Sequence, residues 1–120
     1  MSRHPLSGLA APYDVTTRRD MHFWRFASRS LVMGGAIRLL RDHDNAQILG
    51  RILRAQQRRG AVWVDGWSWE PVPDGVPLSV RFDVIEERRE RGVRLILKAR
   101  LLEVSVVKRA AFAAARTGRA

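Results

Sequence analysis

Three side chains in this sequence can together perform nucleophilic chemistry: His43, Ser79 and Glu103. His43 lies between two aspartates, Ser79 is the hydroxyl of the alternating segment LSVRFDV, and Glu103 is the carboxylate of the apolar run LLEVSVV. A serine hydroxyl is a poor nucleophile at neutral pH and needs an adjacent base, which a third group must orient. A histidine, a serine and a carboxylate on separate strands can meet that requirement. The residue types therefore raise a serine hydrolase as one hypothesis.

Each of the three residues also has a plainer interpretation. A histidine flanked by aspartates is typical of a solvated loop, and a serine on a strand is typical of a small surface residue. Glu103 must either point outward or have a buried partner, because an unpaired carboxylate in an apolar core is costly. Outward exposure is the commoner outcome. From the residues alone, catalysis and surface exposure both stay open.

The elements that must position these side chains are predicted to be β-strands, because apolar and polar residues alternate along them. We expect strands within 6–15, 31–41, 48–53, 62–69, 78–84, 93–98 and 101–107. A polar loop is expected at 42–45, a proline-rich break at 71–77, a charged hairpin turn at 86–92 and a short Ala-rich helix at 110–120. The sequence thus predicts one mostly β (α+β) domain over residues 1–120.

Composition excludes several classes of site. The 120 residues suit one domain, and the absence of cysteine excludes disulfides, thiolate metal sites and cysteine nucleophiles. Three scattered histidines do not suggest a metal cluster, so we expect no metal and no cofactor. No apolar run approaches the roughly 20 residues of a membrane span, and the N-terminus lacks the apolar stretch of a signal peptide. We expect a cytoplasmic protein without membrane contact.

The charge is strongly basic, with 22 Lys and Arg against 12 Asp and Glu and a net charge of +10. Such a balance favours anionic partners, nucleic acid among them. Trp63, Trp67 and Trp69 share one face of a predicted strand. They can stack on bases beside arginines, or they can fill a core or a dimer interface. We favour burial at an interface, which predicts a homodimer.

Five blocks of the sequence carry a family resemblance. In order they are LSGLAAPYDV, RFASRSL, IRLLRDHDNAQILGRIL, PLSVRFDVI and ILKARLLEVSVV, between about residues 6 and 107. The most specific are the Asp-His-Asp block with Gly50 and Arg51, and the Leu-Glu-Val-Ser block. Together they resemble the prohead maturation proteases of tailed phages, serine peptidases similar in fold to herpesvirus assemblins. The resemblance implies an assemblin-like antiparallel β-barrel with few short helices.

The resemblance also implies roles for individual residues. Ser79 is expected to be the nucleophile, His43 its general base, and Glu103 the group that orients the imidazole. Backbone N–H groups near Lys108 and Arg109 are expected to stabilise the oxyanion. The implied substrates are the phage major capsid protein and the scaffold, cleaved inside the procapsid in a bacterial cytoplasm. The basic charge suits acidic scaffold segments, and nucleic-acid contact would be secondary.

The chain departs from the family pattern at three places. The segment before Ser79 is only PVPDGVPL, where the family usually has a helix and more chain. Arg81 stands where a glycine is common, and a cation there can block the cleft or recruit an acidic substrate. The C-terminal segment KRAAFAAART lacks the usual prolines. Two alternatives therefore stay open: a catalytically inactive capsid-assembly or scaffold-binding protein of the same fold, and a basic nucleic-acid-binding β-domain.

Overall fold

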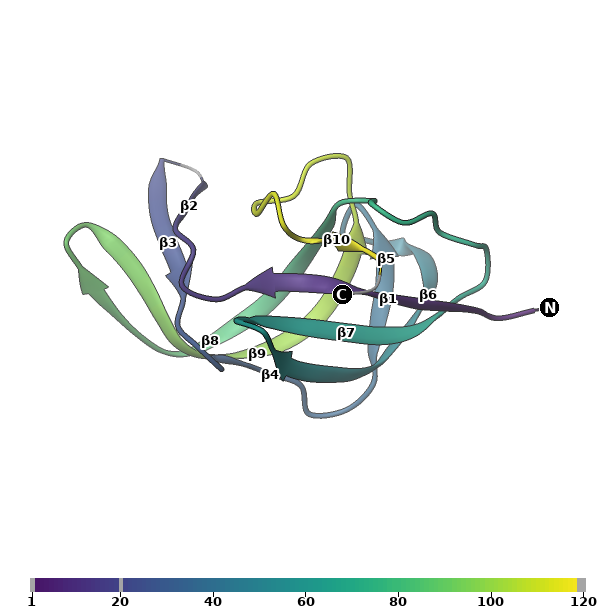
Figure 1. The fold of residues 1–120 in the computed structure, drawn as a ribbon, viewed down its shortest axis with the longest axis horizontal. Helices are drawn as coiled ribbons and strands as arrows, with labels where there is room; N and C mark the ends of the chain where they lie inside the picture. The colour runs from purple at the N-terminus through teal and green to yellow at the C-terminus, as the bar shows by residue number, and fades with distance from the viewer. Residues whose placement is uncertain (1, 20, 119–120) are drawn as a thin grey trace.

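The computed structural model describes residues 2–19 and 21–118, and every regular element among them is a β-strand (Figure 1). The strands are β1 (His4–Pro12), β2 (Thr17–Arg19), β3 (His22–Phe26), β4 (Leu31–Val32), β5 (Ile37–Arg41), β6 (Asp44–Arg58), β7 (Ala61–Ser68), β8 (Leu78–Glu90), β9 (Val93–Val106) and β10 (Arg116–Thr117). The mostly β prediction is confirmed. The predicted short helices are wrong for the described part of the chain.

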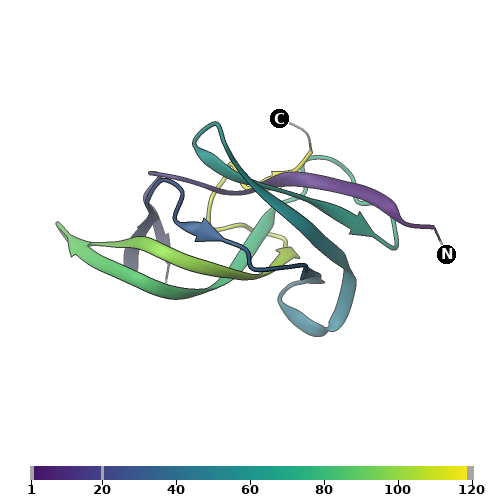
Figure 2. The same ribbon diagram turned by 90° about the horizontal axis from the view of Figure 1, so that it is seen from below.

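Strand β9 organises the sheet. Along one edge it pairs with β8 in antiparallel fashion, and along the other it pairs in turn with β3, β4 and β5, all parallel. From β5 the sheet continues through β6, β7 and β1 to β10 by antiparallel pairing. It is therefore a mixed sheet that curls into a half-barrel (Figures 1 and 2). The antiparallel prediction fails at the three parallel pairs, because β3, β4 and β5 reach β9 by crossovers rather than hairpins.

Three hairpins have two-residue turns, at residues 42–43, 59–60 and 91–92. Both residues of each turn have positive φ angles, between 50° and 77°. This is the type I′ geometry, whose twist matches that of the flanking strands. Because the last turn is so tight, β8 extends to Glu90 and β9 begins at Val93. The predicted charged turn at 86–92 is therefore mostly strand.

An aromatic cluster fills the core between the curled strands. Phe26 packs against Trp24, Phe82 and Phe112, with ring centroids between 4.9 and 6.0 Å apart. Phe112 explains why residues 110–118 of the Ala-rich tail are not a helix; residues 119 and 120 of that prediction lie outside the described residues. The side chains of Phe112 and Ala115 are buried, and the Ala115 carbonyl accepts a hydrogen bond from the Leu78 N–H at 3.0 Å. So short a run has little helical stability of its own, and packing against the start of β8 decides its conformation.

The tryptophans of β7 lie on its outer face. Val62 and Val64 are buried, whereas the intervening Trp63 is half-buried. Trp69 lies beyond the end of the strand, is 37% exposed and contacts Trp67 with ring centroids 4.5 Å apart. The shared face is thus confirmed for the two tryptophans within β7, and burial in the core is wrong. Burial at a homodimer interface stays a prediction.

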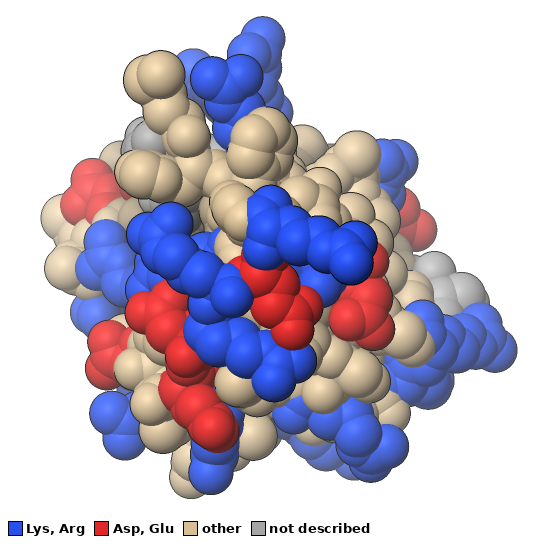
Figure 3. Space-filling view, turned by 90° about the vertical axis from the view of Figure 1, so that its left-hand side faces the viewer, with Lys and Arg blue, Asp and Glu red and all other residues tan. Residues whose placement is uncertain are grey.

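Charged side chains are intermixed at the end of the molecule where the β8–β9 hairpin lies (Figure 3). Ion pairs there join Arg94 to Glu87 and both Arg25 and Arg88 to Glu90. Much of the basic charge of the hairpin is therefore balanced locally. Within the described residues, no helix has the length and apolar character needed to cross a membrane.

Candidate active site

The tight turn between β5 and β6 positions His43. Asp42 and His43 have φ angles of 51° and 58°, in the left-handed region that Asp and His adopt more readily than most residues. The Asp42 N–H donates to the Val106 carbonyl at 3.0 Å, and the His43 N–H donates to the Ser105 hydroxyl at 3.0 Å. Two hydrogen bonds to β9 thus fix the turn and hold the imidazole over the neighbouring strands.

Strands β8 and β9 supply the other two side chains. Ser79 lies opposite Ser105 in the register, and Arg81 lies opposite Glu103. Opposite residues of an antiparallel pair project to the same face. The flanking Leu78 on β8 is buried in the core, so the serine side chain faces away from the core. The pleat therefore places the serine and the carboxylate on the face that the β5–β6 turn covers.

The imidazole of His43 joins the serine to the carboxylate. Its Nε2 lies 3.0 Å from Ser79 Oγ, and its Nδ1 lies 2.9 Å from Glu103 Oε1. The side chain of Glu103 is 3% exposed and that of His43 is 23% exposed. The three side chains predicted to act together are therefore in hydrogen-bond contact, with the carboxylate buried. When Nδ1 carries the proton and donates a hydrogen bond to Glu103, Nε2 is free to accept the serine proton.

Arg81 is a second partner of the buried carboxylate. Its Nε lies 3.5 Å from Glu103 Oε1, the same oxygen that His43 contacts, while its side chain is 51% exposed. The expected outward exposure of Glu103 is wrong, because the His43 turn covers it. Burial is tolerated because a hydrogen bond and a nearby cation compensate the carboxylate. The guanidinium of Arg81 is held at the carboxylate side of the site.

The predicted oxyanion donors lie just beyond β9. Lys108 and Arg109 form an exposed bend, and the preceding Val107 N–H donates to the Pro77 carbonyl at 3.0 Å. That contact brings the bend close to the start of β8, near Ser79. Within the described part of the chain, neither the Lys108 N–H nor the Arg109 N–H donates a backbone hydrogen bond. Their role at an oxyanion stays a prediction.

The segment before Ser79 is an extended loop without a helix, as its prolines indicate. Thr117 pins it, since its hydroxyl donates to the Pro73 carbonyl at 2.7 Å and accepts from the Val76 N–H at 2.9 Å. Beside Ser79 is a small cavity of about 10 Å³, whose other walls include Val80, Ala111 and Phe112. The C-terminal loop thus closes much of the space next to the serine.

Ser105 is the site residue that the sequence reasoning missed. It is fully buried, lies opposite Ser79 and accepts the hydrogen bond that anchors the His43 backbone. The signal was present in LLEVSVV, because alternation puts Ser105 on the same face as Glu103. Because hydroxyl residues are common on strands, this pattern identifies Ser105 as a site residue only when the position of His43 is known.

The described residues hold no group of three or more His, Cys, Asp and Glu side chains that could bind a metal ion. In comparisons with known proteins, no family model, no curated protein and no solved structure matches this chain.

Proposed function

We propose that the protein is a serine endopeptidase of the prohead maturation type, with an assemblin-like fold. The observation that carries this proposal is the pair of contacts that His43 makes, with Ser79 Oγ at 3.0 Å and Glu103 Oε1 at 2.9 Å. Three elements distant in the sequence must fold correctly to produce this geometry. The blocks of sequence that resemble the family are the same blocks that carry the three residues.

The reaction would proceed by acyl transfer. Ser79 Oγ attacks the carbonyl carbon of the scissile peptide, and its proton passes to His43 Nε2. The resulting imidazolium, held by Glu103 through Nδ1–H, gives that proton to the leaving amine as the C–N bond breaks. Water then attacks the carbonyl carbon of the acyl-enzyme and gives a proton to the same nitrogen. That proton passes to Ser79 Oγ as the ester C–O bond breaks and the carboxylic acid leaves. Backbone N–H groups of Lys108 and Arg109 would stabilise the oxyanion of both steps.

The substrates in this proposal are the scaffold and the major capsid protein of a tailed phage, and the place of action is the procapsid within a bacterial cell. The net charge of +10 supports an acidic protein substrate, because opposite charges speed encounter and orient the partners. Contact with nucleic acid would be a secondary property of the same charge.

Co-expression with a capsid protein and scaffold encoded beside this chain tests the proposal. We expect trimmed capsid protein with the natural chain and full-length capsid protein with Ser79→Ala or His43→Ala. Ser28→Ala is the matched control, because Ser28 is exposed and lies outside the site. Equal trimming by all four chains would refute the proposal.

A second candidate, a capsid-assembly protein without protease activity, is favoured by the small size of the cavity beside Ser79, about 10 Å³. This candidate predicts that the chain binds capsid protein or scaffold without cleaving either. In the same experiment it predicts full-length capsid protein in every case, together with co-purification of the partner.

A further inference from the structure

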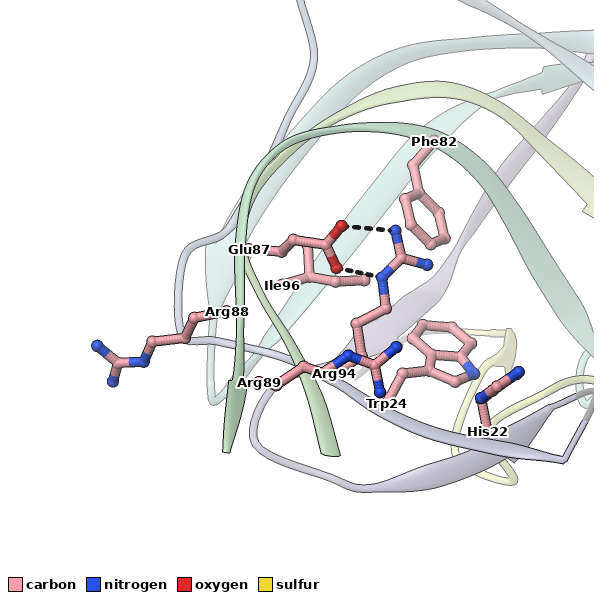
Figure 4. A pocket seen from close by; sticks show the side chains of 8 residues that line it. All are labelled: His22, Trp24, Phe82, Glu87, Arg88, Arg89, Arg94 and Ile96. Atoms are coloured by element: carbon pink, nitrogen blue, oxygen red, sulfur yellow. Dashed lines mark hydrogen bonds and ion pairs between the residues drawn. The ribbon is translucent and has the colours of Figure 1, made fainter. Parts of the chain in front are cut away.

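A second cavity lies away from the three site residues, between β3 and the β8–β9 hairpin (Figure 4). Its volume is about 700 Å³. Trp24, Phe82 and Ile96 provide an apolar wall, and the remaining lining residues are His22, Glu87, Arg88, Arg89 and Arg94. The cavity is thus apolar on one side and charged on the other.

The charged side carries an excess of positive charge. Arg94 donates two hydrogen bonds to the carboxylate of Glu87, forming a bidentate ion pair. Hydrogen bonding to Arg94 lowers the pKa of Glu87 below its usual range. Arg89 lies directly opposite Arg94 in the strand register, an arrangement of like charges that disfavours folding unless an anion lies nearby. Among the described residues, no carboxylate is within ion-pair distance of Arg89. The charge of Arg89 also helps to lower the pKa of Glu87, so Arg89 is partly compensated but has no ion pair of its own, and the cavity lining keeps more arginines than carboxylates.

Two residues relate this cavity to the region of Ser79. Trp24 lines both this cavity and the small one beside Ser79. Phe82 lies three residues after Ser79 on β8 and also lines the larger cavity. At about 3.4 Å per residue, the larger cavity begins about 10 Å along the strand from Ser79, at Phe82, and reaches about 34 Å, at Arg89.

The edge of β8 offers a path between the two cavities. In the described part of the chain, β9 is the only strand that pairs with β8. At the start of β8 the Leu78 N–H donates to the Ala115 carbonyl at 3.0 Å, and beyond Leu78 the other edge of the strand has no strand partner. An extended polypeptide can add to such an edge, gaining main-chain hydrogen bonds while alternate side chains enter pockets. A chain bound in this way with its scissile bond at Ser79 would bring later or earlier residues into the larger cavity.

We propose that this cavity is a substrate subsite that binds an apolar side chain flanked by acidic residues, about three to ten residues from the scissile bond. The inference rests on the proposed function, because it assumes that Ser79 marks the point of cleavage. The apolar side chain packs on Trp24 and Phe82, and an acidic neighbour pairs with Arg89. The cavity thereby selects acidic extended segments among the polypeptides that reach the site.

Peptide binding to the full-length Ser79→Ala protein tests the subsite without cleavage. The probes are a fluorescein-labelled peptide of alternating Glu and Leu, the same peptide with Gln in place of Glu, and a labelled oligothymidylate, each followed by fluorescence anisotropy. We expect the Glu peptide to bind about tenfold more tightly than the Gln peptide, and Arg89→Gln to weaken the Glu peptide about five- to tenfold.

Arg100→Gln is the matched control. It makes the same charge change on β9, but Arg100 is not among the residues that line the cavity, its side chain is exposed, and it pairs with Asp83 at 3.6 Å. We expect it to change the affinity less than twofold. Equal affinities for the Glu and Gln peptides, or equal effects of the two substitutions, would overturn the proposal. Binding of the oligothymidylate alone, weakened by Arg89→Gln, would instead assign the cavity to nucleic acid and overturn it too.

The subsite and the proposed function can fail separately. If the natural chain reacts at Ser79 but its Ser79→Ala variant does not prefer the Glu peptide, the subsite proposal is wrong and the serine peptidase proposal stands. If the Glu peptide binds selectively and Ser79 is inert, the cavity is a binding site for acidic segments in a protein that does not cleave them, and the proposed function is wrong.

Discussion

Glu103→Gln is the substitution that most sharply tests how the buried carboxylate acts. The glutamine has nearly the same size, so the packing of a side chain that is 3% exposed is preserved. What changes is the charge 2.9 Å from His43 Nδ1. In addition, an amide can present its NH₂ group to Nδ1, which stabilises the tautomer that cannot accept the serine proton.

The size of the effect follows from the geometry. With an effective dielectric constant of about 20, a carboxylate at 2.9 Å attracts an imidazolium by about 6 kcal/mol. This is an upper limit, because His43 is 23% exposed to water, which weakens the attraction. A rate loss of roughly 10³- to 10⁴-fold corresponds to about 4 to 5.5 kcal/mol and lies just within that limit. We therefore expect a loss in that range.

The assay is the rate at which a fluorophosphonate modifies the protein, which depends on the same transfer of the serine proton to His43. Glu103→Asp keeps the charge but shortens the side chain, so an intermediate rate is expected. Asp83→Asn is the matched control, because it also converts a carboxylate of this strand pair to an amide but affects only the exposed pair with Arg100. A folded Glu103→Gln protein that reacts within tenfold of the natural chain would refute this reasoning.

Two further predictions concern the scaffold. Gly50→Ala should lower the free energy of unfolding by about 1–3 kcal/mol, because the added Cβ would lie 2.0 Å from the Trp67 carbonyl oxygen. Gly35→Ala is the control, since a Cβ there meets no atom within 4 Å. Equal denaturation midpoints for the two variants would contradict the prediction. Burial raises the pKa of Tyr13, so the folded state loses stability as pH rises through and above about 10, the unfolded value. Tyr13→Phe should abolish this loss of stability at alkaline pH. At neutral pH it should lower the free energy of unfolding by about 1–2 kcal/mol, because the hydrogen bond to Gln57 is lost. Thermal melting curves at alkaline pH that are identical for the two proteins would exclude the mechanism.

Strand content was largely predictable, because period-two alternation is a strong signal. Strand β8 was expected from Leu78, and the break before it follows from Pro71, Pro73 and Pro77. Strand ends were less predictable: β8 runs on through a charged segment, several of whose side chains form ion pairs at the surface instead of being buried. The Ala-rich tail was misjudged because helix propensity is weak, and burial of Phe112 outweighs it.

Local sequence patterns could not predict that the side chains of the three site residues contact one another. These contacts depend on the parallel pairing of β5 with β9 and on a type I′ turn with a histidine at its second position, neither of which local sequence specifies. The residue types raised His43, Ser79 and Glu103 as candidates, but their roles as base, nucleophile and orienting group came from the resemblance to prohead proteases, because each residue by itself favoured an ordinary structural role. Ser105 was missed because its importance lies in a backbone contact to His43.

Covalent labelling of Ser79 tests the central proposal most directly. A fluorophosphonate transfers its phosphonyl group to an activated serine: a P–O bond forms, fluoride leaves, and the serine proton passes to the base. We predict a single adduct, located by peptide mass spectrometry at Ser79, that is formed by the natural chain and by Ser28→Ala but lost in His43→Ala and Ser79→Ala. An unmodified natural chain under conditions that label a known serine hydrolase, or an adduct that forms equally well without His43, would contradict it.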